Sequence, residues 1–124
     1  MSLQAPEGAK YIDLLIRGDD LALDPAGVPE LVWDRDSIAQ DIKHAIRESG
    51  YLVEMVAERS RDRRRLLMQK IRLLLEDDLR IVPGTVEIEP LLPGFPKDEG
   101  RWGLVAQTRE FGAVDLDLSQ LVTT

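Results

Sequence analysis

The chain has 124 residues, 44% of them hydrophobic and 31% charged, which is typical of a soluble globular protein of one compact domain. Its net charge of −7 disfavours a free-standing nucleic-acid binder, because the overall field repels phosphate. The absence of cysteine excludes disulfide and thiol chemistry and fits a cytoplasmic protein; with a single histidine, neither a zinc site nor a Ser/His/Asp triad is expected.

The beginning of the chain carries no hydrophobic segment of a secretory signal, and its first letters, MSL, are interpreted as a remnant of an expression vector. We expect residues 1–10 to be a disordered or vector-derived N-terminus and residues 11–124 to form a single α+β domain. No apolar run approaches the roughly 20 residues of a membrane-spanning helix, so no membrane contact is expected.

Residues 11–33 alternate short apolar segments with turn signals. The segments are YIDLLI, LALD and LVWD, and the turns fall at Gly18-Asp19 and at Pro25-Ala26-Gly27. This pattern predicts strand, turn, strand, turn, strand, that is, a short antiparallel meander.

The next segment, DRDSIAQDIKHAIRESG, predicts a helix with both ends marked. Ser37 and Gln40 have the spacing of a capping box, and Gly50 is a typical terminator. His44 lies opposite the apolar residues and is interpreted as a surface side chain. Because the apolar stripe is narrow, this helix is expected to pack on one side only. The stripe consists of Ile38, Ile42, Ala45, Ile46 and Ser49.

The segment from Tyr51 to Glu58 fits a short helix or a strand, and the pattern leaves both open. The longest periodic segment then runs from Arg61 to about Asp78. Its apolar side chains cover a wide arc of the helical wheel, so this second main helix is expected to be central and contacted on more than one side. The arc comprises Leu66, Leu67, Met68, Ile71, Leu73, Leu74 and Leu75.

After Arg80 the pattern changes to strand signals. Residues 86–89 alternate between apolar and acidic side chains, between Pro83-Gly84 and Pro90. The segment PGFPKDEG predicts a loop, and RWGLVAQTR and AVDLDL predict C-terminal antiparallel strands. Strands, two main helices and strands again, without βαβ alternation, indicate the α+β class with an antiparallel sheet.

The arginine run RSRDRRR, from Arg59 to Arg65, is the most conspicuous charge feature of the chain. A helical wheel scatters it: Arg61 and Arg65 lie on the polar face, whereas Arg63 and Arg64 flank the apolar arc. An acid interrupts the run, and no aromatic side chains interleave to stack bases. The run therefore indicates a solvated helix start, or pairing with acids of this chain or of a partner. Such acids can also offset the unfavourable position of arginine near a helix N-terminus.

The remaining candidates for catalytic residues are paired carboxylates. Glu54 and Glu58 are one helical turn apart if their segment is helical, and such a pair can cleave a glycosidic bond. Any acidic protein offers pairs of this kind, and the acids near the N-terminus do not have EF-hand spacing. We therefore predict no catalytic, cofactor-binding or metal-binding residues and no cofactor.

Two long stretches carry a family resemblance. In DLALDPAGVPELVWDRDSIAQDIKHAIRES, an acidic meander precedes a helix of the form I-x-Q-x-I-x-x-x-I/L, here Ile38 to Ile46. In IRLLLEDDLRIVPGTVEIEP, an apolar helix is followed by a turn with acids and an arginine, then by an alternating strand. Over about residues 11–118 the chain resembles an uncharacterised tail-cluster family of temperate contractile-tailed phages, itself similar to the W-like baseplate wedge family. The wedge family has Glu-Pro-Arg in the turn, whereas Glu76 to Arg80 keeps acids and arginine without the proline.

The resemblance implies a baseplate-wedge-like fold and a non-catalytic structural role in the contractile-tail baseplate of a phage or prophage. The implied partners are other baseplate and tail proteins, and no nucleic acid. The implied location is the bacterial host cytoplasm during assembly and then the tail baseplate of the virion. The oligomeric state of the isolated chain stays open. The candidate interface residues are Arg80, Asp78 and Glu76 of the turn, and Arg61, Arg63, Arg64 and Arg65, which would face an acidic neighbour.

Two alternatives stay open beside this role. Several wedge-family members carry a tail-lysozyme label, so the first alternative is a tail-associated, peptidoglycan-cleaving enzyme that uses carboxylates such as Glu54 and Glu58. The second is a nucleic-acid-binding accessory protein. It would hold DNA in a strongly salt-dependent way through Arg63, Arg64 and Arg65.

Overall fold

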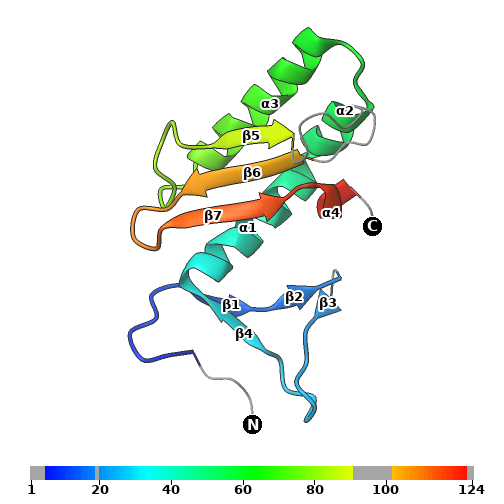
Figure 1. Cartoon of the computed structure of the whole chain (residues 1–124). Coiled ribbons are helices and arrows are strands. Elements are labelled where there is room, and N and C mark those ends of the chain that lie inside the picture. The colour runs from blue at the N-terminus through cyan, green and yellow to red at the C-terminus, as the bar shows by residue number, and fades with distance from the viewer. Residues whose placement is uncertain (1–4, 19, 91–101, 123–124) are drawn as a thin grey trace.

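Helices and antiparallel strands occupy separate parts of the chain, which confirms the predicted α+β class. Figure 1 shows the computed structural model, which describes residues 5–18, 20–90 and 102–122. The elements in chain order are β1 (Ile12–Leu14), β2 (Ile16–Arg17), β3 (Asp20–Leu21), β4 (Leu31–Trp33), α1 (Asp34–Ser49), α2 (Tyr51–Ala57), α3 (Arg61–Glu76), β5 (Glu87–Pro90), β6 (Trp102–Gln107), β7 (Ala113–Asp117) and α4 (Ser119–Val122).

The N-terminal strands form the predicted meander, with one addition. Strand β2 pairs with β3, and a bridge joins Leu23 to Pro29, so the chain reverses at both predicted turns. The outer strands β1 and β4 also pair with each other, with Ile12 opposite Trp33. The unit thereby closes on itself, and we call it the N-terminal ribbon, residues 11–33.

The second turn of the ribbon is fixed by a side chain. Oδ1 of Asp24 accepts hydrogen bonds from the backbone N–H groups of Ala26 and Val28, both at 2.9 Å. Gly27 has a φ of +79°, a left-handed conformation that glycine adopts without steric cost. This turn chemistry is the one that the Pro-Ala-Gly signal predicts.

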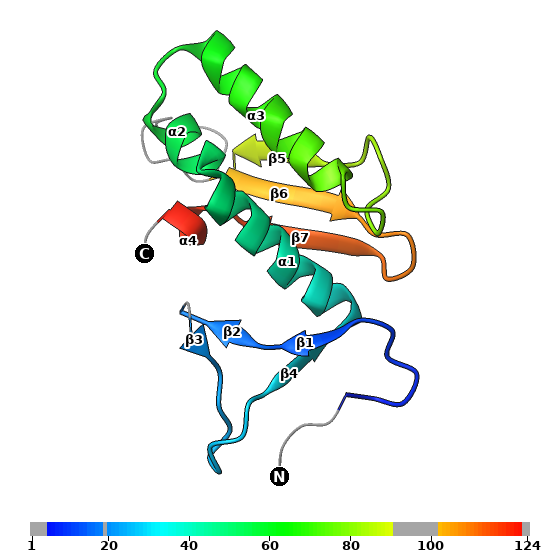
Figure 2. The same cartoon turned by 180° about the vertical axis from the view of Figure 1, so that it is seen from behind.

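Helix α1 lies between the C-terminal sheet and the ribbon (Figures 1 and 2). It contacts β1, β4, β7 and the other three helices, and Ile38 and Ile46 are fully buried. The prediction that this helix packs on one side only is therefore wrong. Its isoleucine stripe meets the sheet and the helices, while Ser37 and Gln40, beside the stripe, are buried as well. The helix ends at Gly50 in the left-handed conformation, as predicted.

The capping box expected at Ser37 and Gln40 is not formed, because the helix already starts at Asp34 without a side-chain cap. Gln40 instead reaches the ribbon. Its Oε1 accepts the N–H of Ile16 and its Nε2 donates to the carbonyl of Leu14, both at 2.8 Å. The side-chain amide thus takes the place of a neighbouring strand and satisfies backbone groups at the junction of β1 and β2.

The segment after Gly50, for which the sequence pattern allows a helix or a strand, forms a helix, α2, which packs against α3. The prediction that α3 is the central helix is wrong. Leu66 and Leu73 of its apolar arc are 56% and 59% exposed, because α3 lies at the edge of the molecule against α1 and α2. A wheel shows how wide an apolar arc is, but it does not show what covers the arc. The buried side chains of α3 are Leu67, Ile71 and Leu75.

The predicted C-terminal strands form a three-stranded antiparallel sheet in the order β5-β6-β7. Its register aligns Ile88, Leu104 and Leu116 in one buried row, which belongs to the same core cluster as the buried side chains of the helices. The neighbouring row points away from the helices and is exposed. It comprises Glu87, Val105 and Asp115. The predicted loop PGFPKDEG lies outside the described residues.

Replacing Gln40 by alanine is expected to loosen the ribbon without unfolding the core, because it removes both bonds to the junction of β1 and β2. Exchange of the Ile16 amide should accelerate roughly tenfold. Hydrogen–deuterium exchange with peptide mass spectrometry measures this. Lys43→Ala, on an exposed position of the same helix, is the control. Equal protection in both variants would contradict the role of Gln40.

Candidate protein-interaction site

Arg80, in the turn after α3, joins two other parts of the chain. Its Nε donates to Oδ1 of Asp78 at 2.9 Å, and its Nη2 donates to Oδ2 of Asp41 on α1 at 3.0 Å. Asp78 Oδ1 also accepts the backbone N–H of Arg80 at 2.9 Å, so the turn is fixed by its own side chain. The planar guanidinium with several donors is suited to such a double pairing, which a lysine cannot reproduce.

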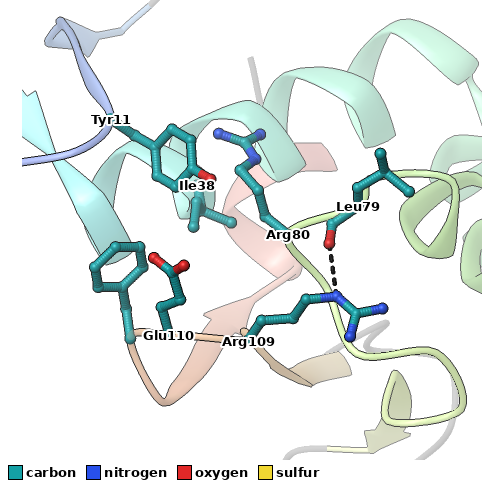
Figure 3. Close-up of a pocket in the computed structure, with 7 residues that line it drawn as sticks. Tyr11, Ile38, Leu79, Arg80, Arg109 and Glu110 are labelled. Carbon is teal, nitrogen blue, oxygen red and sulfur yellow. Dashed lines mark hydrogen bonds between the residues drawn. The ribbon is translucent and has the colours of Figure 1, made fainter.

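An aromatic side chain covers the same arginine. The guanidinium of Arg80 lies 5.2 Å from the ring centre of Tyr11, within the range of a cation–π interaction. The ring of Tyr11 also meets Phe111 edge-on, at 5.9 Å and 84°. Figure 3 shows Tyr11 beside Arg80, and the Nε of Arg109 bound to the carbonyl of Leu79. The hollow between these residues measures about 50 Å³ and therefore has no room for a ligand of metabolite size.

The start of the ribbon is tied to α1 beside this group. Oδ1 of Asp34 accepts the backbone N–H groups of Lys10 and Tyr11 at 2.8 and 3.0 Å, and the N–H of Asp34 donates to the carbonyl of Tyr11 at 2.7 Å. Asp34 has a φ of +51°, which aspartate tolerates better than most residues. The Lys10 ammonium pairs with Glu110 at 2.6 Å, and this carboxylate raises the pKa of Lys10.

The charges around Arg80 hold each other ionised. Hydrogen bonds from the Arg80 side chain, and in addition from its backbone, hold the pKa of Asp78 below its usual value, against the opposing effect of partial burial. The bond to Asp78 is also the largest reason why the pKa of Arg80 is raised, and the bond to Asp41 adds to it. Arg80 is thus engaged in intramolecular pairs, with its side chain 23% exposed.

The predicted interface residues fall into two groups at opposite ends of α3. Asp78 and Arg80 follow its C-terminus, and Glu76 near them accepts the backbone N–H of Gly84 at 2.8 Å. The arginines from Arg61 to Arg65 lie at the start of the helix. A helix of 16 residues is about 24 Å long, so the structure does not bring the two groups together within one chain.

The helix start has its own local contacts. Ser60 is the N-cap and accepts the N–H of Arg63 at 3.4 Å, and Nη2 of Arg64 donates to the carbonyl of Glu58 at 2.8 Å. The Arg63 side chain lies 3.5 Å from the Glu58 carboxylate and is 76% exposed. Arg61 and Arg65 are exposed and form no ion pair with any residue that the structure describes.

The carboxylates considered for glycoside cleavage do not share a helix face. Helix α2 ends at Ala57, and Glu58 has an extended backbone. The Glu58 carboxylate accepts the N–H of Ser60 at 3.0 Å and faces Arg63, whereas Glu54 is exposed on α2.

His44 lines an open groove of about 800 Å³ between the ribbon, α1 and β7, and is half-buried there. Within residues 5–18, 20–90 and 102–122, no group of three or more histidines and carboxylates could hold a metal. In the same ranges, no helix has both the length and the apolar character to cross a membrane.

Two members of the Arg80 group, Asp41 and Tyr11, are not predictable from the sequence pattern. Asp41 is 39 positions from Arg80 and Tyr11 is further still, so no local spacing connects them. The one available signal is the I-x-Q-x-I pattern, because Gln40 and Asp41 are its polar positions. Both point out of the isoleucine stripe and bind segments that are distant in sequence.

Fold and site together define a small acidic α+β protein whose polar side chains join its segments and leave apolar and charged surfaces exposed. Residues 12–117 match the model of a family described as a protein of unknown function (DUF2590). A protein of Haemophilus phage HP1 (strain HP1c1), described as the uncharacterized 12.7 kDa protein in the lys 3′ region, is 46% identical over 105 residues, which is 85% of this chain and 89% of that protein. No solved structure matches the chain. The chain belongs to the DUF2590 family, a family of phage proteins.

Arg80→Ala is expected to lower the free energy of unfolding by about 2 kcal/mol, because Asp78 and Asp41 lose their common partner in a partly buried place. Urea denaturation followed by circular dichroism measures the loss. Arg80→Lys keeps the charge but lacks the planar guanidinium, so its free energy of unfolding should lie between those of wild type and Arg80→Ala. Arg61→Ala, at an exposed position, should change stability by less than about 0.5 kcal/mol. Equal stability of Arg80→Ala and wild type would contradict the assigned role.

Asp78 should make stability depend on pH in the acid range. Its pKa is lower in the folded than in the unfolded chain, where it is about 4. Asp78 therefore adds stability above the unfolded pKa, and this part is lost as the pH falls through the folded pKa. Denaturation midpoints of wild type and Asp78→Asn, measured from pH 7 down to about pH 3, should converge as the pH falls. A constant difference would contradict this contribution.

Proposed function

We propose that this protein is a non-catalytic structural protein of a phage or prophage contractile-tail baseplate, where it binds neighbouring tail proteins. Its membership in a phage protein family supports the proposal. So does the resemblance of its meander, I-x-Q-x-I helix and acid–arginine turn to tail-cluster and wedge proteins. On this proposal the protein acts in the host cytoplasm during assembly and then in the baseplate of the virion.

The observation that carries the proposal is the apolar surface of the N-terminal ribbon. Five large hydrophobic side chains of this short unit are between 41% and 54% exposed. Exposed apolar surface gathered on one unit marks a protein contact, because it is costly to leave in water. These side chains are Ile12, Leu14, Leu21, Leu23 and Val28.

In this proposal Arg80 is a positioning residue behind the contact surface. It fixes Tyr11, at the base of the ribbon, against α1 and the turn. Asp78 and Glu76 hold that turn from within, through their bonds to Arg80 and Gly84. The arginines of the α3 start remain exposed to an acidic neighbour.

The test is co-expression of the tagged chain with the proteins of neighbouring genes, followed by affinity capture and mass spectrometry. Wild type should retain tail proteins. The double variant Ile12→Ser, Leu23→Ser should retain them at least tenfold less, since hydrophobic contacts are lost from the surface rather than from the core. Leu79→Ser is the matched control, because Leu79 is 84% exposed outside the ribbon.

The Arg80→Ala variant should weaken capture through its effect on the ribbon, in parallel with faster amide exchange there. Capture of no tail protein by wild type would contradict the baseplate role. Equal capture by wild type and the ribbon double variant would contradict the assigned surface and leave the role itself standing.

A further inference from the structure

Helix α3 presents an apolar stripe that nothing in the described part of the chain covers. Leu66 and Leu73 are seven residues apart, so they lie on the same side of the helix, two turns from each other. They are 56% and 59% exposed. The buried side of α3 faces the opposite way, toward α1 and α2.

The charges of α3 follow a gradient along the same outer surface. Arginines dominate its start, and Glu76 and Asp77 mark its end, with no basic residue in the last turn. Both sets oppose the helix macrodipole, which is positive at the N-terminus and negative at the C-terminus. Asp62 is the exception, as the acid of the first turn. A helix with such a gradient is best complemented by another one that runs in the opposite direction.

We propose that the outer face of α3 binds α3 of a second copy of this chain in an antiparallel, twofold-symmetric pair. This inference does not depend on the tail role. A twofold axis makes each contact twice and requires a self-complementary surface. With the axis near the middle of the helix, Leu66 of one copy lies opposite Leu73 of the other.

The flanks of the stripe satisfy the same register. A twofold axis perpendicular to the helices brings like flanks of the two copies together. By helical spacing Arg65 and Glu76 share one flank, and Arg63 and Asp77 lie on the other. In the register that pairs Leu66 with Leu73, Arg63 falls within about one residue of Asp77 of the second copy, and Arg65 falls within about two residues of Glu76 of the second copy. Each copy therefore contributes two arginines, two carboxylates and two leucines, and the twofold axis makes each kind of arginine–carboxylate pair twice.

The groups that this pair needs are available. Arg65 and Asp77 form no ion pair with another described residue, and Arg63 is 76% exposed beside Glu58. Glu76 uses Oε1 for the Gly84 N–H, so its second oxygen can accept an arginine. Two members of the face meet like charges and should limit the affinity: Asp62 lies opposite Asp77 of the second copy, and the exposed Lys70 lies close to Lys70 of the second copy near the axis.

The experiment is sedimentation equilibrium of the full chain over a concentration series. Arg63→Glu and Asp77→Arg should each raise the dissociation constant of the pair on the order of tenfold, because two attractive pairs become repulsive. The double variant restores both pairs with exchanged signs and should return to near the wild-type value. Asp62→Asn should strengthen the association.

These variants separate association from folding. Glu at position 63 completes a capping box with Ser60, and Arg at position 77 suits the negative end of the helix, so each single change favours the helix itself. Arg35→Glu on α1 and Asp115→Arg on β7, both exposed, make the same charge changes elsewhere and should leave the association unchanged.

A wild-type chain that stays monomeric at about 1 mM overturns the proposal, even if a tail protein binds α3 instead. So does a double variant no tighter than the single ones. Self-association without capture of tail proteins would overturn the baseplate role and keep this inference.

Discussion

The N-terminal ribbon depends on polar contacts with α1, because few of its apolar side chains are buried. Among its described apolar residues only Ala22 is buried, whereas the core is built from α1, α2, α3, α4, the sheet and the segment between α3 and the sheet. The amide of Gln40 and the carboxylate of Asp34 supply the hydrogen bonds that a neighbouring strand would otherwise give. This constraint explains why a unit that is short and exposed still has one position on the core. It also explains why polar residues of α1 are buried next to its isoleucines.

Arg80 extends the same principle to the other side of α1. A charge pair that is partly buried adds little net stability, since desolvation cancels much of the attraction, but a broken pair leaves a charge without compensation. Its effect is therefore on geometry: the turn after α3, helix α1 and the base of the ribbon are held in one arrangement. Asp78 restricts the turn from within, since its side chain accepts the backbone N–H of Arg80.

Periodicity and turn chemistry predicted the elements well, because both are local. The two ribbon turns, the end of α1 at Gly50 and the C-terminal strands follow from residues within a few positions of each other. Position in the fold was not predictable in this way. The narrow stripe of α1 is central and the wide arc of α3 is peripheral, because burial depends on what the rest of the chain places against a helix. Gln40 has capping-box spacing but binds 24 positions away, and no spacing rule connects Asp41 with Arg80. The turn with Asp78 and Arg80 can thus be found in the sequence, whereas the contacts of Arg80 with Asp41 and Tyr11 depend on the fold.

The exposed surfaces lie at opposite ends of the molecule: the ribbon on one side of α1 and α3 on the other (Figures 1 and 2). They also differ in chemistry, since the ribbon exposes five large hydrophobic side chains beside acidic ones, and the outer face of α3 combines two leucines with a charge gradient. In the proposed pair the α3 faces meet at the twofold axis, and both ribbons remain available for other proteins. A self-complementary face cannot continue into a chain of copies, because each copy uses it once. Growth of an assembly would then have to proceed through the ribbons. The α3 face would thus join two copies, and the ribbons would attach the pair to other proteins.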